Sequence, residues 1–342
     1  MTNDDLLLEV ENLRTHYFLD EGTVRAVDGV DFVIKRGQTL GVVGESGCGK
    51  SVTARSVLRI VPKPGRIVEG QITFHRQVRK DGGATTTELI NLTALDPMGP
   101  VMRSLRGKEM TLVPQEPMAS LSPVHTIGDQ IGEAIILHQK VSKAEARAKT
   151  IEILDLVGFP QPKQRVDSYP HQLSGGLRQR AVIAMALSCH PSLLIADEPT
   201  TALDVTTEAQ ILKLMRSLQR DLGMAIMYIT HNLGVVAQMT ERVIVMYMGK
   251  VVEEADVDDI FHDAKHPYTA SLLRSIPRLG IKTSEQRRLE TIRGTVPDPY
   301  SIPKGCPFHP RCIKRIAGVC DVREPANVEV GRGHKARCLL YQ

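Results

Sequence analysis

The feature that most constrains this chain is a glycine-rich segment at residues 44–51, set between a β-branched run and a helix-like stretch. Its sequence, Gly-Glu-Ser-Gly-Cys-Gly-Lys-Ser, matches the pattern G-x-x-x-x-G-K-[ST] of a phosphate-binding loop. Glycines there let the backbone turn tightly and bring its N–H groups against phosphate oxygens. The segment therefore predicts an α/β fold with chemistry at the carboxyl ends of parallel strands.

The residues around this loop are the types that phosphate chemistry needs. Lys50 supplies a positive charge to the β- and γ-oxygens of a triphosphate, and Ser51 offers a hydroxyl to Mg²⁺. The apolar run 193–196 predicts a buried strand that ends in Asp197 and Glu198. Asp197 is placed to hold Mg²⁺ through a water molecule, and Glu198 to polarise the attacking water as a general base.

The order of the motifs resembles that of the ATPase subunits of ATP-binding-cassette (ABC) transporters. Between the loop and the acidic pair lie Gln115 and the segment Leu-Ser-Gly-Gly-Leu-Arg-Gln at 173–179, and after the pair come Leu203-Asp204 and His231. The likeness runs from about residue 5 to residue 260. It implies a P-loop (RecA-like) parallel-sheet core, an antiparallel β subdomain and a helical signature subdomain at about 116–190. The nucleotide-binding domain would span 1–260, and a Cys-rich C-terminal extension 261–342.

The resemblance also assigns roles to individual residues. Gln115 is expected to reach the metal, and His231, with Lys50 and Glu198, to form the catalytic set. Tyr17 is expected to stack on adenine, and Phe18 is the alternative. The whole set implied to contact ATP is Tyr17, Gly44, Glu45, Ser46, Gly47, Cys48, Gly49, Lys50, Ser51, Val52, Gln115, Ser174, Gly175, Gly176, Gln179 and Asp204.

The Ser174-Gly175-Gly176 segment implies a partner. In the family it caps a helix and completes the γ-phosphate shell of the opposite subunit, using free N–H groups and a helix dipole. This chain carries one set of motifs, so it is expected to pair with a second, paralogous ATPase chain. The pair would act beneath two transmembrane permease subunits that are served by an extracytoplasmic solute-binding protein.

Four cysteines gather near the C-terminus, at Cys306, Cys312, Cys320 and Cys338. A disulfide is not expected in a cytoplasmic protein, so the cluster predicts a metal centre. Spacers of five, seven and seventeen residues suit a [4Fe–4S] cluster better than zinc, although zinc and four free thiols remain alternatives. The tail resembles the C-terminal extension of the dipeptide/oligopeptide permease branch, in which some members carry such a cluster.

Bulk composition limits the function classes. The net charge of +4 is spread along the chain, which gives no reason to expect a nucleic-acid partner. The apolar runs are shorter than the roughly 18–20 residues that cross a bilayer. With no signal-peptide pattern at its start, the chain is expected at the cytoplasmic face of the inner membrane, held there by partner chains. The favoured function is ATP-driven import of di- or oligopeptides. One alternative is import of another solute, such as an oligosaccharide, an opine or nickel. The other is that the chain is a soluble ABC ATPase with a redox-sensing cluster.

Periodicity predicts the elements themselves. Strands are expected at 6–18, 26–36, 39–43, 193–196 and 224–229, and helices at 51–60, 177–188 and 206–222. The capping-box pattern of Ser142 and Glu145 predicts a further helix that ends at Gly158. The apolar residues of this helix, Ala144, Ala148, Ile151 and Leu154, are expected to fall on one face. The polar, Gly/Thr-rich residues 76–88 predict an exposed inserted loop.

Overall fold

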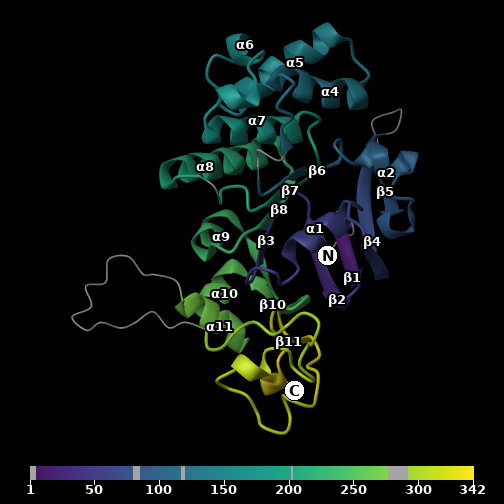
Figure 1. Cartoon of the computed structure of the whole chain (residues 1–342). Coiled ribbons are helices and arrows are strands. Elements are labelled where there is room, and N and C mark those ends of the chain that lie inside the picture. Colours follow the sequence, from purple (N-terminus) through teal and green to yellow (C-terminus); the bar gives the residue numbers. More distant parts are fainter. Residues whose placement is uncertain (1–4, 80–84, 117–119, 202, 276–291) are drawn as a thin grey trace, which may run out of the picture.

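The computed structural model of the protein describes residues 5–79, 85–116, 120–201, 203–275 and 292–342. This part of the chain contains two sheets, a layer of helices and a C-terminal extension (Figure 1). The first sheet has four antiparallel strands in the order β2-β1-β4-β5. They are β1 (Leu6–Leu19), β2 (Gly22–Lys35), β4 (Gly65–Arg79) and β5 (Thr85–Asn91).

The predicted loop at residues 76–88 is wrong at both of its ends. Residues 76–79 belong to β4 and residues 85–88 to β5, and the two strands pair there, with Arg76 opposite Glu88 and Val78 opposite Thr86. Val78 and the threonines 85–87 are β-branched, which favours extended backbone even where the surface is polar. Residues 80–84 lie outside the described residues. The segment therefore lengthens a hairpin of the antiparallel sheet.

The second sheet has eight strands in the order β11-β12-β10-β9-β3-β8-β7-β6. The five strands from β9 to β6 run parallel to one another. They are β3 (Thr39–Val43), β6 (Met110–Val113), β7 (Leu193–Asp197), β8 (Ala225–Ile229) and β9 (Arg242–Tyr247). Every residue of β3, β7 and β8 is buried, as their apolar runs predict. The predicted parallel α/β core is confirmed.

The parallel strands bring the functional segments to one edge of the sheet. The glycine-rich loop follows β3, and Gln115 comes two residues after β6. Glu198 and His231 follow β7 and β8 in the same way. Because carboxyl ends of parallel strands meet at one edge, four segments that are far apart in the sequence converge there.

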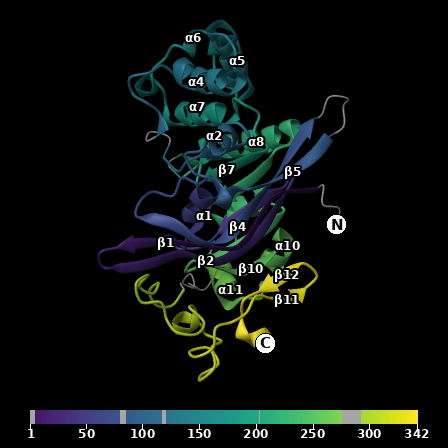
Figure 2. The same cartoon turned by 90° about the vertical axis from the view of Figure 1, so that its right-hand side faces the viewer.

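Helices cover the core sheet on both faces (Figures 1 and 2). Helix α1 (Lys50–Val57) lies in the core between the antiparallel sheet and the parallel sheet, together with α2 (Pro100–Leu105). A second core joins the other face to α8 (Val205–Leu222), α9 (Leu233–Met239) and the helical layer. Helix α8 begins at its N-cap Asp204 and ends at Gly223, which adopts the left-handed conformation at φ 63°.

The helical layer contains α4 (Ile127–Gln139), α5 (Lys143–Leu156), α6 (Pro162–Arg165) and α7 (Gly175–Leu187), all within the expected range 116–190. The predicted capping box is confirmed, because Ser142 and Glu145 bond to each other's backbone N–H. The predicted apolar face of α5 is right for Leu154, which is buried, and for Ile151, which packs against the second core, but wrong for its two alanines. Ala144 and Ala148 are exposed, while Ala146, Thr150, Ile153 and Leu154 are buried. The larger apolar side chains at 153, 154 and 157 set the face, because alanine has little surface to bury.

The C-terminal extension joins the core sheet instead of forming a sheet of its own. Its strands β11 (Val328–Gly331) and β12 (His334–Ala336) add to β10 (Lys250–Asp256). The fully buried Glu253 of β10 accepts the N–H of Lys265 at 2.6 Å and of His266 at 2.9 Å. Its carboxylate also lies 2.7 Å from Nε2 of His334. One carboxylate thus ties β12 and the start of α11 (Pro267–Arg274), which follows α10 (Val257–His262), to the core.

None of the helices among the described residues combines the length and the apolar character that spanning a membrane requires. The longest of those described, α8, has charged residues along its surface and buries one face in the second core. The exposed side of α8 is therefore polar.

Candidate functional site

The glycine-rich loop has the backbone that a phosphate cradle needs. Gly47 adopts φ 79°, and no atom would lie within 4 Å of a Cβ added there, so its backbone faces open space. Gly49 adopts φ 106°, and a Cβ there would lie 2.2 Å from the carbonyl oxygen of Ala26. Only glycine fits this second position, which presents the N-terminus of α1 to the loop.

Lys50 points back over the loop. Its side chain is buried with 5% of the residue exposed, and Nζ donates to the carbonyl oxygens of Gly44 at 2.8 Å and Glu45 at 3.0 Å. These carbonyl bonds hold the ammonium group at the mouth of the loop, where phosphate oxygens would bind. Cys48 lies beneath it, and burial raises the pKa of its thiol. Cys48 therefore behaves as a small apolar group of the core.

Two of the three expected magnesium ligands, Ser51 and Asp197, lie next to each other, while Gln115 bonds to Glu198. Ser51 Oγ donates to Asp197 Oδ1 at 3.0 Å. Burial raises the pKa of Asp197, the neighbouring Glu198 raises it further, and the bond from Ser51 opposes both. A hydroxyl and a carboxylate held together in a buried site are oxygen ligands of the kind Mg²⁺ prefers. Ser51 and Asp197 therefore fit the ion, which would neutralise charge on the β- and γ-oxygens when bound.

Glu198 is the centre of a hydrogen-bonded network. Its carboxylate lies 3.0 Å from Nδ1 of His231, and it accepts bonds from Gln115 Nε2 at 3.2 Å and Thr201 Oγ1 at 3.0 Å. Burial alone would raise the pKa of Glu198, but the bonds from His231 and Thr201 outweigh it and lower the pKa below its ordinary value. The carboxylate therefore stays ionised, as a base must. Its backbone sits at φ 48°, uncommon for a residue other than glycine.

These groups surround one cavity of about 390 Å³. The structure brings to it nine of the residues predicted from the sequence, including Lys50, Glu198 and His231, which are expected to be catalytic. Ala26 and Thr201 also line it, and the sequence reasoning did not include them. Thr201 lies three residues after Glu198, and this closeness to the acidic pair in the sequence was the available signal. The full lining is Ala26, Ser46, Gly47, Gly49, Lys50, Ser51, Val52, Gln115, Glu198, Thr201 and His231.

The strand register distinguishes Tyr17 from Phe18. Tyr17 pairs with Val24, two residues from the Ala26 that lines the cavity, and residues paired across antiparallel strands share a face. Phe18 pairs with Thr23, and the guanidinium of Arg66 lies 4.3 Å from the centre of its ring. Tyr17 therefore lies on the face that leads to the phosphate loop, and Phe18 already has a cationic partner elsewhere.

The Ser-Gly-Gly segment lies apart from this cavity, and none of its three residues lines it. Ser174 caps α7 by accepting the N–H of Leu177 at 3.4 Å. Gly175 has open space where a Cβ would be, whereas Gly176 would contact Thr207 of α8 at 2.7 Å. The segment presents a helix N-terminus at the surface, as predicted.

Two residues of the predicted ATP set are used differently in the described chain. Gln179 is fully buried in α7, and neither of its side-chain polar atoms has a hydrogen-bond partner there, so it does not reach a nucleotide surface. Asp204 is exposed and caps α8, accepting the N–H of Thr207 at 2.9 Å. Its placement away from the cavity leaves the predicted contact with ATP untested.

The four tail cysteines are neighbours, but they do not form a ligand group. Cys306, Cys320 and Cys338 are buried and Cys312 half-buried. Burial and, to a smaller extent, the other three thiols raise the pKa of Cys306 to about 11. Among the residues that the structure describes, no group of three or more His, Cys, Asp or Glu side chains is placed to hold a metal ion. The predicted iron–sulfur or zinc centre therefore has no structural support.

Comparison with known families agrees with this geometry. The model of the family described as "ABC transporter" matches residues 27–201, and one described as "Oligopeptide/dipeptide transporter, C-terminal region" matches residues 252–320. The first range holds the phosphate loop, Gln115, the Ser-Gly-Gly segment and Glu198. The chain belongs to the ABC transporter family. It is one of the ATP-binding subunits of that family, and the predicted cassette fold and ATPase class are shown.

Curated relatives match almost the whole chain. A probable peptide ABC transporter ATP-binding protein, y4tR, of Sinorhizobium fredii is 49% identical over 98% of this chain and 95% of its own length. The oligopeptide transport ATP-binding protein AppD of Bacillus subtilis is 46% identical over 98% of this chain and 97% of its own. The dipeptide transport ATP-binding protein DppD of the same species is 45% identical over 98% and 94%. The resemblance therefore includes the extension as well as the cassette.

Solved structures share the cassette. A dimeric post-hydrolysis state of the ATP-binding cassette MJ0796, bound to ADP and Pi, superposes with a TM-score of 0.61 at 26% identity. It covers 73% of this chain and 99% of that one. The cbiO1 cassette of Clostridium perfringens, described as part of the transporter complex cbiONQ, gives a TM-score of 0.60 over 76% and 92%.

Proposed function

We propose that this chain is the ATP-hydrolysing subunit of an importer for di- or oligopeptides. The observation that carries the proposal is Glu198: a carboxylate kept ionised by His231 and Thr201, beside a phosphate loop and a Ser51–Asp197 magnesium site. Support for the solute class comes from the tail, which matches the oligopeptide/dipeptide transporter C-terminal region. Relatives named for peptide transport extend over both parts of the chain.

Each group of the site would have its own role in hydrolysis. The loop N–H groups and Lys50 bind the β- and γ-phosphates and balance their charge. Glu198 orients the attacking water and withdraws its proton, while His231 holds the carboxylate in position. Gln115 donates to Glu198 and, as the family pattern implies, would also reach Mg²⁺ and lie near the docked permease. These roles follow the family pattern, and each is open to mutation.

The assembly that we propose has several chains. Ser174, Gly175 and Gly176 would complete the ATP site of a second, paralogous ATPase subunit, and Gly175 has the open surface that such a contact needs. Two permease subunits would span the inner membrane, with this chain on its cytoplasmic face, and an extracytoplasmic binding protein would deliver the solute. No nucleic acid takes part. Another solute, such as an oligosaccharide, an opine or nickel, would use the same ATPase.

The test is transport by the reconstituted complex. The chain is co-purified with its permease and partner ATPase, placed in lipid vesicles and supplied with the solute-binding protein. Uptake of labelled peptides, sugars and nickel is then followed with and without ATP. Uptake should require ATP and should fall sharply with Glu198→Gln. ATP-dependent uptake of sugars or nickel, with none of peptides, would change the solute class but keep the ATPase role. Hydrolysis with no transport of any solute would refute the importer.

The tail cysteines are the second part of the proposal. We propose that Cys306, Cys312, Cys320 and Cys338 bind a [4Fe–4S] cluster, with zinc as the alternative. Four cysteine thiolates are the usual ligands of such a cluster, and these four are neighbours in the extension. No group of side chains among the described residues is placed to hold an ion, so binding would require the four thiols to rearrange. No step of ATP hydrolysis involves this centre.

A further inference from the structure

The phosphate loop is held from outside by the C-terminal extension. Arg311 of the extension pairs with Glu45 of the loop through both guanidinium Nη atoms, Nη1 to Oε2 at 2.6 Å and Nη2 to Oε1 at 3.0 Å. The two residues are 266 positions apart in the chain. A two-pronged arginine–carboxylate pair fixes both distance and orientation.

The side chain of Arg311 is buried at this contact. Its side chain is only 4% exposed, against 25% for Glu45. Nε donates to the carbonyl oxygen of Arg293 at 3.1 Å, so the guanidinium is held by the extension's own backbone. Tyr247 of β9 lies beneath it, 5.9 Å from Cζ to the ring centre. A buried charge with these partners is costly to leave unpaired, which makes the contact with Glu45 specific.

The main chain of Glu45 is held as well. Its N–H donates to the hydroxyl of Tyr268 in α11 at 2.9 Å. Tyr247, Tyr268 and Phe308 pack against one another with ring centres 4.7 to 5.3 Å apart, which joins β9, α11 and the extension. On the other side, the carbonyl oxygen of Glu45 accepts the bond from Lys50. Glu45 therefore connects the extension directly to the lysine that serves the phosphates.

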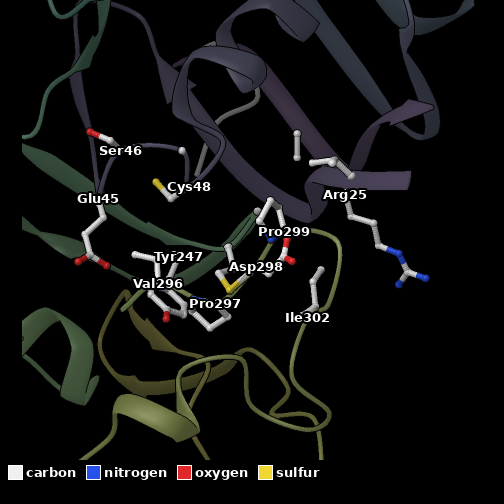
Figure 3. A pocket seen from close by; sticks show the side chains of 15 residues that line it. Arg25, Glu45, Ser46, Cys48, Tyr247, Val296, Pro297, Asp298, Pro299 and Ile302 are labelled. Carbon is white, nitrogen blue, oxygen red and sulfur yellow. The ribbon is translucent and has the colours of Figure 1, made fainter. Parts of the chain in front are cut away.

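A cavity of about 420 Å³ separates the loop from the next part of the extension (Figure 3). Residues 45–48 form one wall, and Val296, Pro297, Asp298, Pro299 and Ile302 of the extension lie opposite. Ala26, Ser46 and Gly47 line both this cavity and the ATP cavity. The loop is thus a thin partition with the extension on one side and the nucleotide site on the other. The hydrogen bonds described between the extension and residues 45–48 reach Glu45.

We propose that the C-terminal extension positions the phosphate loop through the contacts of Arg311 and Tyr268 with Glu45, so that affinity for nucleotide depends on the extension. This inference rests on the proposed function, because it presumes that the loop binds ATP. Arg311 and Tyr268 are positioning residues that act through Glu45 on Lys50. Anything that displaces the extension would loosen the loop without touching the nucleotide.

The test is equilibrium binding of a fluorescent ATP analogue with Mg²⁺ to the full chain. Arg311→Gln and Glu45→Gln should each weaken binding by about tenfold, within the range of interaction energies for contacting residues. The double variant should be no weaker than the worse single variant. Arg311→Lys, which keeps the charge, should recover part of the affinity. The matched control is Arg315→Gln, an exposed arginine of the same extension, which should bind like the wild type.

A purely structural role predicts different results. Then Arg311→Gln would lower the thermal unfolding midpoint while the dissociation constant of the analogue stayed unchanged, and the inference would be overturned. If Arg311→Gln does not fold, Tyr268→Phe keeps the packed ring and removes only the hydroxyl. If the single variants Tyr268→Phe and Arg311→Lys both fold and both bind the analogue with wild-type affinity, the inference would also be overturned. No binding by the wild-type chain would instead refute the proposed function.

Discussion

Nδ1 of His231 lies 3.0 Å from a carboxylate oxygen of Glu198, and this contact joins the ends of two neighbouring strands, β7 and β8. Glu198 has only 11% of its side chain exposed, whereas His231 is 55% exposed. Glu198, the proposed base, is therefore protected from solvent, and His231 stays accessible to the cavity. This asymmetry suits a pair in which one group does chemistry and the other holds it in place and contacts substrate.

Replacing the base should separate binding from turnover. In Glu198→Gln the phosphate loop and the Ser51–Asp197 pair are intact, so ATP should bind with about wild-type affinity. Single-turnover hydrolysis by the assembled complex should fall by about 10²- to 10⁴-fold, because general-base catalysis is lost. Glu152→Gln, an exposed carboxylate of α5, is the control. Turnover near the wild-type rate would remove Glu198 from its assigned role.

The bond between His231 and Glu198 should be visible in the pH profile. In the wild type the pKa of Glu198 lies below its ordinary 4.5, because the bonds from His231 and Thr201 outweigh burial. Removing a donor to the carboxylate destabilises its charged form and raises its pKa. In His231→Ala the acid limb of kcat should therefore move to higher pH, in addition to any fall in rate. His231→Gln, which keeps an N–H donor, should shift it less, and superimposable limbs in all three proteins would contradict the prediction.

Removing the loop lysine should weaken nucleotide binding itself. Lys50→Ala deletes the charge that serves the β- and γ-oxygens, and hydrogen bonds to charged groups contribute about 1.5–3 kcal/mol. The dissociation constant for labelled ATP should therefore rise by at least about tenfold. The same titration on Glu198→Gln provides the contrast, because that variant should still bind. Equal affinities for the two variants would show that Lys50 is not the phosphate ligand.

Much of the catalytic site could be predicted because each motif follows a strongly patterned element. The short apolar runs of β3, β7 and β8 predict buried strands. The carboxyl ends of parallel strands lie at one edge of the sheet, so the motifs that follow them come together. The same reasoning failed for residues 76–88, where Thr85–Thr87 gave a polar strand with no apolar face to detect. It failed in part for α5, where Leu154 is buried as predicted but Ala144 and Ala148 carry too little apolar surface to set the buried face.

The contact between Arg311 and Glu45 shows a different limit. Nothing local to Glu45 distinguishes it from the variable positions of the phosphate-loop pattern, and Arg311 lies between two cysteines that dominate any interpretation of the tail. Their meeting depends on the extension adding β12 to the core sheet and on the buried Glu253 fixing α11. Such a contact between distant segments follows from tertiary packing, which composition and periodicity do not encode.

A bulky residue at the signature segment should block the shared site while leaving this chain's own loop intact. Ser174 is exposed at the N-terminus of α7, so Ser174→Arg places a long cation where the partner's phosphate would approach. Labelled ATP should bind to the isolated chain with unchanged affinity, while ATP-dependent association with the partner ATPase and turnover by the complex should be lost. Ser104→Arg, at an exposed serine of α2, is the control. Strong activity from a strictly monomeric preparation would contradict the shared-site argument.

The last prediction concerns the tail thiols. If they bind a [4Fe–4S] cluster, protein purified without air should be brown, absorb broadly near about 400 nm and contain about four irons per chain. Cys312→Ser should lose colour and iron, whereas Cys189→Ser, a half-buried cysteine just after α7, should keep both. Labelled ATP should still bind to Cys312→Ser, although less tightly if the loss of the centre loosens Arg311, its neighbour in the chain. Stoichiometric zinc without iron would assign a structural metal, and protein with neither metal would show that the thiols are free.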